Sequence, residues 1–339
     1  MPEPPPGPAT VPASRTSREG ESGVPGRRVG HSGTDGAGRV REWRPPFPLD
    51  LAGTLAPLRR GRGDPTWRSA ADGAAVWRTC TTPDGPATMR VARRADGTVV
   101  AAAWGPGADR VLDGLPSLLG ADDDPTAFTA HHPLIADAAR RRPGLRFGST
   151  RRVWDVLVPA VLEQKVTGVE ARRSWRELCH RFGDPAPGPA PDGMRVPPTP
   201  AQIRAVPDWA WHRAGVDSAR RRAILACAAV ASRLEGAAGL GGEDGRILLR
   251  RVPGIGVWTA AEIAQRAWAD ADAVSFGDFH IPTLVGWALV GRPLDDAGML
   301  AVLAPYIPQR ARAVRYVELS GFRRPRFGPR FSPRDYRAM

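Results

Sequence analysis

Apolar residues in the C-terminal two thirds of the chain recur at three- and four-residue spacing, which is the pattern of amphipathic helices. Ala260, Ile263, Ala264 and Ala267 follow this spacing and would line one helix face. From about residue 124 onward the pattern predicts a series of helices that form one all-α region. The expected helices cover 133–142, 151–163, 166–182, 200–206, 217–235, 243–251, 257–269, 279–290, 295–304 and 308–320, with a proline-rich connector over 183–198.

A different pattern precedes the helices. Short runs rich in Val, Thr and Ala are separated by the turn sequences PDG (83–85) and ADG (95–97), which is typical of antiparallel strands joined by tight turns. Strands together with helices predict an α+β fold class, with a small antiparallel-sheet domain ahead of the mainly all-α region. We expect strands over 74–81, 87–92 and 99–104, and a helix over 108–119.

The two ends of the chain differ from its middle in composition. Residues 1–45 are rich in Pro, Gly, Ser and Arg and have few apolar anchors, so burial cannot repay the entropy lost on ordering. The last residues alternate Arg, Pro and Phe. The expected divisions are a disordered tail over 1–45, an α+β sheet domain over 46–123, an all-α domain over 124–320 and a basic tail over 321–339.

The charge of the chain indicates its class of partner. The 339 residues carry a formal net charge of +13, with a pI near 11.1, which favours a polyanion such as DNA. Almost all the basic residues are Arg, and Lys165 is the only lysine, so part of the Arg content also fits a GC-rich coding bias.

The cysteines and the hydropathy narrow the class further. Cys80, Cys179 and Cys227 are widely spaced, so we expect buried thiols of a reducing cytosol, without a zinc site, an iron–sulfur loop or a disulfide framework. The sequence contains neither an apolar run long enough for a membrane span nor the charged-then-apolar order of a signal peptide. A cytoplasmic protein is therefore expected.

The sequence PGIG (253–256) interrupts the helical pattern between two expected helices. Pro lacks an amide hydrogen and Gly accepts a positive φ without strain, so the stretch predicts a tight hairpin with Ile255 plugged inward. Unpaired amides at the start of the next helix bind anions such as a DNA phosphate, although a plain glycine-rich corner fits PGIG equally well. The candidate DNA contacts of the hairpin are Gly254, Ile255, Gly256, Val257 and Thr259.

The sequence GDFHI (277–281) follows the second of these helices. An extended connector over 273–277 leads to Asp278, and Pro282 is compatible with the first turn of a helix, where amides need no intrahelical acceptor. Asp278 is therefore expected at a helix N-cap. Capping alone is the commonest role of Asp at this position, and the alternative is a catalytic carboxylate close to the hairpin.

VPGIGVWTA followed by GDFHI resembles the helix–hairpin–helix DNA glycosylase superfamily, and within it the bacterial 3-methyladenine DNA glycosylase II branch. The stretches 142–146, 154–164 and 200–203 also resemble that branch. The likeness covers about Phe47 to Ser320 and is strongest from Arg142 onward. It implies a two-lobed helical core behind a small sheet domain, with Asp278 as the catalytic residue for hydrolysis of the N-glycosidic bond.

The resemblance also implies partners and cofactors. The partner would be double-stranded DNA containing damaged bases, bound by a monomer associated with the nucleoid in a bacterial cytoplasm. No cofactor or metal is expected, apart from a monovalent cation that hairpin carbonyls hold in this family. Trp258 stands where bifunctional relatives carry a lysine, so the chain would be a monofunctional glycosylase without lyase activity, and Trp258 would form a wall of the base pocket.

Three positions depart from the family pattern. Glu262 and Gln309 occupy places where relatives carry aromatic residues that sandwich the base. We assign both to the base pocket, where Glu262 would attract a cationic base; pairing with Arg266 on a solvated face is the equal alternative. Gln164 and Lys165 form the turn expected to contact DNA, with Lys165 in place of an apolar wedge.

Two functions of different class fit these patterns. The first is base excision repair of alkylated purines of the 3-methyladenine type, or of another damaged base. The second is a non-catalytic DNA-damage-binding protein that kept the hairpin and lost the pocket. The intact GDFHI sequence favours an enzyme, because phosphate binding alone needs no Asp at position 278.

Overall fold

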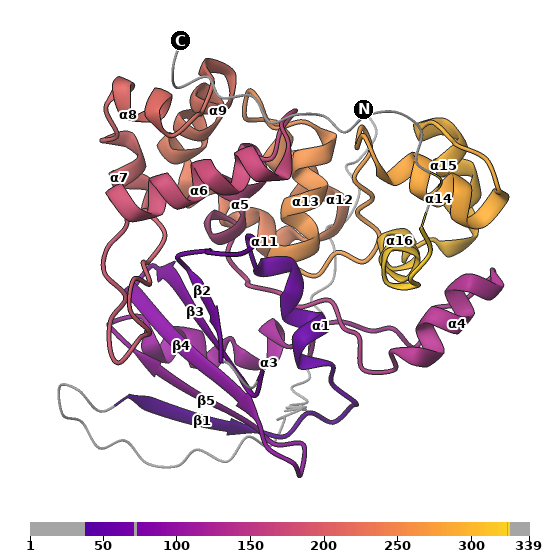
Figure 1. Cartoon of the computed structure of the whole chain (residues 1–339), viewed down its shortest axis with the longest axis horizontal. Coiled ribbons are helices and arrows are strands. Elements are labelled where there is room, and N and C mark those ends of the chain that lie inside the picture. Colours follow the sequence, from indigo (N-terminus) through magenta and orange to yellow (C-terminus); the bar gives the residue numbers. More distant parts are fainter. Residues whose placement is uncertain (1–37, 71–72, 324, 326–339) are drawn as a thin grey trace, which may run out of the picture.

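The computed structural model describes residues 38–70, 73–323 and 325. Its N-terminal part is an antiparallel sheet with the strand order β1-β5-β4-β3-β2 (Figure 1). The three predicted strands are confirmed as β3, β4 and β5, and the PDG turn joins β3 to β4 with Thr82 opposite Gly85. The strands of the sheet are β1 (Arg39–Trp43), β2 (Trp67–Ser69), β3 (Ala75–Thr82), β4 (Gly85–Arg93) and β5 (Val99–Trp104).

The boundary predicted for the N-terminal tail at residue 45 is wrong. Residues 39–43 form β1, which pairs along its whole length with β5, from Arg39 opposite Ala103 to Trp43 opposite Val99. Only Trp43 of this edge strand is buried, and Val40 is 57% exposed, so the strand lacks the apolar alternation that would have revealed it. Residues 1–37 of the predicted tail, and residues 324 and 326–339 of the C-terminal one, lie outside the described residues.

Short helices complete the sheet domain. The helix predicted over 108–119 is divided at Gly114, because Pro116 in the first turn of the second piece cannot donate a backbone hydrogen bond. Leu112 and Leu115 on either side of the break pack with Met89 of the sheet in one apolar core. These helices are α1 (Leu51–Leu55), the 3-10 turn Ala56–Leu58, α2 (Ala108–Asp113) and α3 (Leu115–Leu118).

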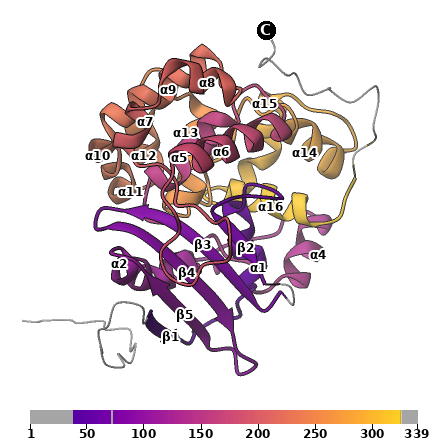
Figure 2. The same cartoon turned by 60° about the vertical axis from the view of Figure 1, so that its left-hand side comes forward.

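The helices after residue 124 form two groups with separate apolar cores, as the resemblance implied (Figures 1 and 2). The first group consists of α5 (Trp154–Leu162), α6 (Gly168–Phe182), α7 (Pro200–Arg204), α8 (Asp208–Arg213), α9 (Ser218–Ala229), α10 (Ala231–Leu234), α11 (Gly236–Leu240), α12 (Gly242–Arg250) and α13 (Val257–Ala267). The second consists of α4 (Pro133–Arg141), α14 (Ile281–Val290), α15 (Asp296–Leu303), the 3-10 turn Ala304–Tyr306 and α16 (Arg310–Leu319). Each of the ten predicted helices is present, with 217–235 divided at Val230, while α8 and α11 were missed.

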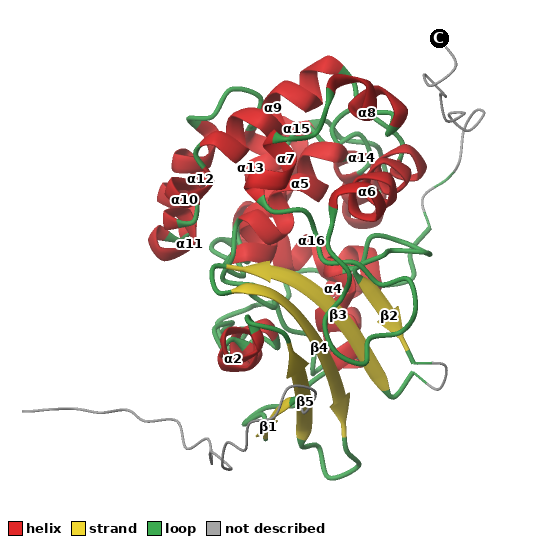
Figure 3. Cartoon of the chain, turned by 90° about the vertical axis from the view of Figure 1, so that its left-hand side faces the viewer, coloured by secondary structure: helices red, strands yellow, loops and turns green. Residues whose placement is uncertain are grey.

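The helices α5, α9 and α13 lie above the sheet in Figure 3, and buried charges join the sheet to this first helical group. Arg78 of β3 and Arg152 both pair with Asp155 in the first turn of α5, and Arg152 lies 2.9 Å from Oδ2 of Asp155. The proline-rich connector also lies along the sheet, because the Thr79 hydroxyl donates to the carbonyl of Arg195 and the Thr81 hydroxyl to that of Pro197. We call Arg78, Arg152 and Asp155 the junction.

Over the described part of the chain, no single helix is long and apolar enough to cross a membrane. One bent pair, Ser218–Ala229 with Ala231–Leu240, meets the length and composition criteria together.

Candidate functional site

The hairpin between α12 and α13 has the predicted form. Gly254 adopts a φ of +91° and packs so closely on α9 that a Cβ at this position would lie 2.5 Å from the Cβ of Ala223. Ile255 is 5% exposed and belongs to the core of the first helical group, which confirms its predicted role as an inward plug. Because this side chain is inside, Ile255 can meet DNA only through its backbone.

The start of α13 is open to solvent. Gly256 is the N-cap residue, and no side chain of the described residues accepts hydrogen bonds from the first amides of the helix. A Cβ on Gly256 would meet no atom within 4 Å, and Val257 is 44% exposed. Unpaired amides and the helix dipole therefore form a positive, accessible surface that suits an anion.

Gln164 and Thr259 have an internal role that the sequence did not reveal. The side-chain amide of Gln164 donates to the carbonyl of Gly254 at 2.9 Å and to the hydroxyl of Thr259 at 2.8 Å. Thr259 is 2% exposed, so it can meet DNA only through its backbone, and that contact stays a prediction. These bonds tie the turn between α5 and α6 to the hairpin. The Gly254 carbonyl is thus already an acceptor, and the monovalent cation at the hairpin stays a prediction.

The same turn presents Lys165 to solvent. Lys165 is exposed and has a φ of +53°, in the left-handed region that few residues other than Gly adopt. Among the described residues its ammonium has no hydrogen-bond or ion-pair partner. Arg220 is 3% exposed and stabilises the turn by donating to the carbonyl of Leu162 at 2.9 Å.

Asp278 and Trp258 meet between the two helical groups. The indole Nε1 of Trp258, in α13, donates to Oδ2 of Asp278 at 3.0 Å. Oδ1 of Asp278 accepts from the amides of His280 at 2.7 Å and Ile281 at 2.9 Å. The helix α14 begins at Ile281 with His280 as its N-cap residue, so the prediction of Asp278 at the N-cap is wrong by two residues, although its side chain accepts from the amides at the helix start.

The surroundings of Asp278 contain no compensating cation. No Lys or Arg side chain of the described residues pairs with this half-exposed carboxylate. Phe279, which the sequence analysis did not assign, is 68% exposed beside it, with its ring 5.0 Å from that of His280. The only sequence feature that could have marked Phe279 as a site residue is its position directly after Asp278 in a connecting loop.

Glu262 is buried, which corrects the expectation of a solvated face. The side chain of Arg266 pairs with Oε2 of Glu262 at 2.8 Å, as the four-residue spacing predicted, and Ser275 donates to Oε1 at 2.5 Å. With Glu262 only 9% exposed and both carboxylate oxygens engaged, the side chain fastens the loop that carries Asp278. Glu262 therefore has no free carboxylate oxygen with which to attract a cationic base.

Gln309 likewise has internal partners. It is 6% exposed, accepts from Arg312 and donates to the carbonyl of Asp124 at 3.2 Å. Arg312 is fully buried and pairs with Asp123. Gln309 therefore connects α16 to the segment that follows the sheet domain, and no contact places it beside Trp258 or Asp278, as a base-pocket residue would require.

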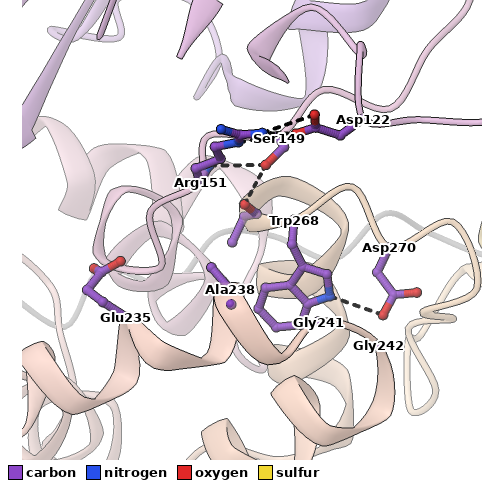
Figure 4. Close-up of a pocket in the computed structure, with 11 residues that line it drawn as sticks. Asp122, Ser149, Arg151, Glu235, Ala238, Gly241, Gly242, Trp268 and Asp270 are labelled. Atoms are coloured by element: carbon purple, nitrogen blue, oxygen red, sulfur yellow. Dashed lines mark hydrogen bonds and ion pairs between the residues drawn. The ribbon is translucent and has the colours of Figure 1, made fainter. Parts of the chain in front are cut away.

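A cavity of about 630 Å³ lies elsewhere (Figure 4). Trp268, in its wall, directly follows α13, and the 11 residues of α13 span about 16 Å at 1.5 Å per residue. The cavity is thus at the opposite end of α13 from Trp258, and no predicted site residue lines it. Its charged lining is mainly acidic, with Asp122, Glu235 and Asp270 against Arg151, so it does not suit a nucleic acid.

Within the described residues, no group of three or more His, Cys, Asp or Glu side chains is arranged to hold a metal ion.

Comparison with known proteins identifies the fold. No protein-family model matches the sequence, and no curated protein matches it. A 3-methyladenine DNA glycosylase from Archaeoglobus fulgidus shares 16% identity at a TM-score of 0.67, over 82% of this chain and 97% of that one. An 8-oxoguanine glycosylase/lyase from Clostridium acetobutylicum shares 11% identity at a TM-score of 0.64, over 85% of this chain and 100% of that one. The chain therefore has the fold of the helix–hairpin–helix DNA glycosylases.

Proposed function

We propose that the protein is a monofunctional DNA glycosylase that removes alkylated purines of the 3-methyladenine type. The observation that carries the proposal is the carboxylate of Asp278, which is half-exposed, oriented by Trp258 and unpaired with any cation of the described residues. Trp258 also joins this carboxylate to the hairpin, because it lies in the first turn of α13, whose start is open to an anion. The fold shared with DNA glycosylases supports the same reaction.

DNA would be held first by its backbone. A phosphate would accept hydrogen bonds from the amides at Gly256 and Val257, where no side chain competes. Arg222 and Arg251 are exposed close by, since Ala223, next to Arg222, packs against Gly254, and Arg251 is the C-cap residue of α12, two residues before Pro253. These contacts fix the register of the duplex without reading its sequence. Lys165, exposed on the turn tied to the hairpin, would enter the space left by the extruded nucleotide.

Chemistry would follow base extrusion, which costs a few kcal/mol. As the base leaves, positive charge develops on the sugar, and a carboxylate beside C1′ stabilises that charge and orients the attacking water. Asp278 can do this because none of its partners is a cation: Trp258 and two backbone amides are neutral donors. An alkylated purine already carries positive charge, so its departure needs little protonation by the enzyme.

Water would be the nucleophile for base release. The second residue after Gly256 is Trp258, and the described hairpin contains no lysine that could attack the sugar there. Trp258, half-buried, would form one wall of the pocket for the extruded base. We expect the protein to act as a monomer on the DNA of a bacterial cytoplasm.

The decisive experiment measures bases released from methylated duplex DNA by wild type and by Asp278→Asn. We expect 3-methyladenine or 7-methylguanine from the wild type, and a rate lower by at least about 10²-fold in the variant. Both proteins should bind the duplex with similar affinity. A second duplex carrying 8-oxoguanine tests the other substrate class represented among proteins of this fold. Binding without any base release would overturn the enzymatic proposal in favour of a damage-binding protein.

A further inference from the structure

We propose that Lys165 captures the abasic product of base release by forming an imine with the C1′ aldehyde of the sugar. This inference deepens the proposed function and rests on it for the docking of DNA. It concerns the step after base release, so it leaves water as the nucleophile that displaces the base. Four features of the turn between α5 and α6 support the proposal.

The first feature is availability. Lys165 is the only lysine of the chain, it is exposed, and its ammonium has no partner among the described residues. The turn keeps its shape through other side chains: Gln164 holds the hairpin and Arg220 holds the carbonyl of Leu162. The amine of Lys165 therefore has no evident part in the internal contacts of the fold.

The second feature is the backbone of Lys165. Its φ of +53° lies in a region that is strained for residues with a Cβ, while Gly adopts it freely. A Gly would close the same turn with less strain. Local strain of this kind concentrates at functional sites, and here it directs a long amine-bearing side chain outward from the turn.

The third feature is proximity to Asp278. The side chain of Gln164 lies 2.8 Å from the Thr259 hydroxyl, and the adjacent Trp258 lies 3.0 Å from Oδ2 of Asp278. The lysine turn and the carboxylate are thus both hydrogen-bonded to the first turn of α13, through the adjacent residues Thr259 and Trp258. A sugar whose C1′ lay beside Asp278 would therefore be close to this turn, and the flexible four-carbon stem of Lys165 would extend toward it.

The fourth feature is the chemistry of the product. Base release leaves a hemiacetal that opens to an aldehyde at C1′, and a neutral primary amine attacks such a carbonyl. The ammonium of Lys165 first gives a proton to water, and its nitrogen then forms a bond to C1′. The carbonyl oxygen leaves C1′ as water with the two remaining amine hydrogens, and an imine results. Hydrolysis returns the same amine and aldehyde, so the capture is reversible and needs no other reactant. It would retain the reactive product on the protein.

The test uses full-length protein and a duplex that already contains one abasic site, so that no base release is needed. Sodium borohydride reduces an imine to a stable amine, and the covalent complex is resolved on a denaturing gel. We expect a complex with wild type and with Asp278→Asn, and its loss in Lys165→Arg, which keeps the charge and the backbone demand. Binding of the same duplex, measured by fluorescence anisotropy, shows whether Lys165→Arg still docks.

A rescue variant separates chemistry from structure. Lys165→Cys should give no complex until 2-bromoethylamine converts the exposed thiol into an amine-bearing analogue of lysine, which should restore the complex. The native cysteines do not interfere because Cys80, Cys179 and Cys227 are buried, and burial raises the pKa of Cys227 to about 12. The α-amine at Met1 is controlled by mass-spectrometric mapping of the linked peptide.

Three results would overturn the proposal: wild type binds the abasic duplex without trapping, Lys165→Arg traps as well as wild type, or the link maps to Met1. None of these results bears on base release. Conversely, trapping at Lys165 by a protein that frees no methylated base would support the capture and reject the alkylpurine assignment.

Discussion

Two aspartates near helix starts, Asp155 and Asp278, have opposite surroundings. The Asp155 side chain is 1% exposed and is paired with Arg78 and Arg152 at the junction. Burial raises the pKa of Asp155, but the two guanidinium groups outweigh this effect, so its pKa lies below the usual value. Asp278 is half-exposed and accepts only from neutral donors.

This difference bears on what each carboxylate can do. The charge of Asp155 is compensated within the fold, so it has no capacity to stabilise a further positive charge. The charge of Asp278 is uncompensated by any cation of the described residues, while Trp258 and the amides of α14 still hold the carboxylate in one orientation. Preorganised charge of this kind is what a developing oxocarbenium requires. Burial and pairing therefore distinguish a structural aspartate from a candidate catalytic one.

The largest expected effect is on stability at the junction. In Asp155→Asn the two buried guanidinium groups lose their partner, and we expect the free energy of unfolding to fall by about 3–5 kcal/mol. Asp278→Asn is the matched control: the Asn side-chain oxygen can still accept from the α14 amides, so its loss should stay below about 1 kcal/mol. Urea denaturation measures both. Equal losses would show that Asp278 is as structural as Asp155.

The pairing of Asp155 with Arg78 and Arg152 makes the stability of the protein depend on pH. Because the pKa of Asp155 is lowered in the folded protein, its stabilisation is present above its ordinary pKa of about 3.9 and is lost as pH falls through the lower folded value. The stability gap between wild type and Asp155→Asn should therefore narrow as pH decreases below about 4. Denaturation midpoints measured between pH 3 and pH 7 would check this, and a constant gap would contradict the assigned pairing.

The hairpin offers a second matched pair, with a smaller expected effect. Gly254→Ala combines a φ of +91° with a close approach to Ala223, so we expect a loss of about 1–3 kcal/mol in stability. At Gly256 the φ is −88° and the space around the Cβ is open, so alanine should cost below about 1 kcal/mol.

In DNA binding, in contrast to stability, we expect the larger effect from Gly256→Ala. A methyl group on Gly256 would stand beside the amides proposed to hold phosphate, so this variant should bind DNA less tightly while remaining folded. Fluorescence anisotropy with an undamaged duplex measures the affinity. Unchanged binding by Gly256→Ala would place the phosphate contact elsewhere on the chain.

Local sequence signals predicted the elements of the site well. Pro253 and the two glycines predicted the hairpin, and Pro282 placed Asp278 near a helix start. Such features depend on backbone preferences of a few adjacent residues. The two-lobed core followed from the resemblance, and the strands from the PDG and ADG turns.

Contacts between distant segments could not be predicted in the same way. The i,i+4 pairing of Glu262 with Arg266 was visible in the sequence, but its burial depends on Ser275 and on the carbonyl of Pro57, which accepts from Arg266 at 3.0 Å. The bond from Gln164 to Gly254 joins residues 90 positions apart. Polar residues give no periodic signal for such pairs, so the internal contacts of Gln164, Thr259, Glu262 and Gln309 were not predicted.

The smallest expected effect concerns the bond that orients Asp278. Trp258→Phe keeps an aromatic wall and removes the indole N–H that lies 3.0 Å from Oδ2. Since the carboxylate is half-exposed, water can replace this donor, and we expect a loss of about 1 kcal/mol, or roughly fivefold in the rate of base release. Single-turnover kinetics on methylated duplex would measure the rate at saturating protein. Removing a cationic partner of Asp155 would lower the free energy of unfolding. Removing the Trp258 donor of Asp278 should change the stability little. A rate loss as large as that of Asp278→Asn would mean that Trp258 takes part in the reaction itself, as more than an orienting donor and a wall of the pocket.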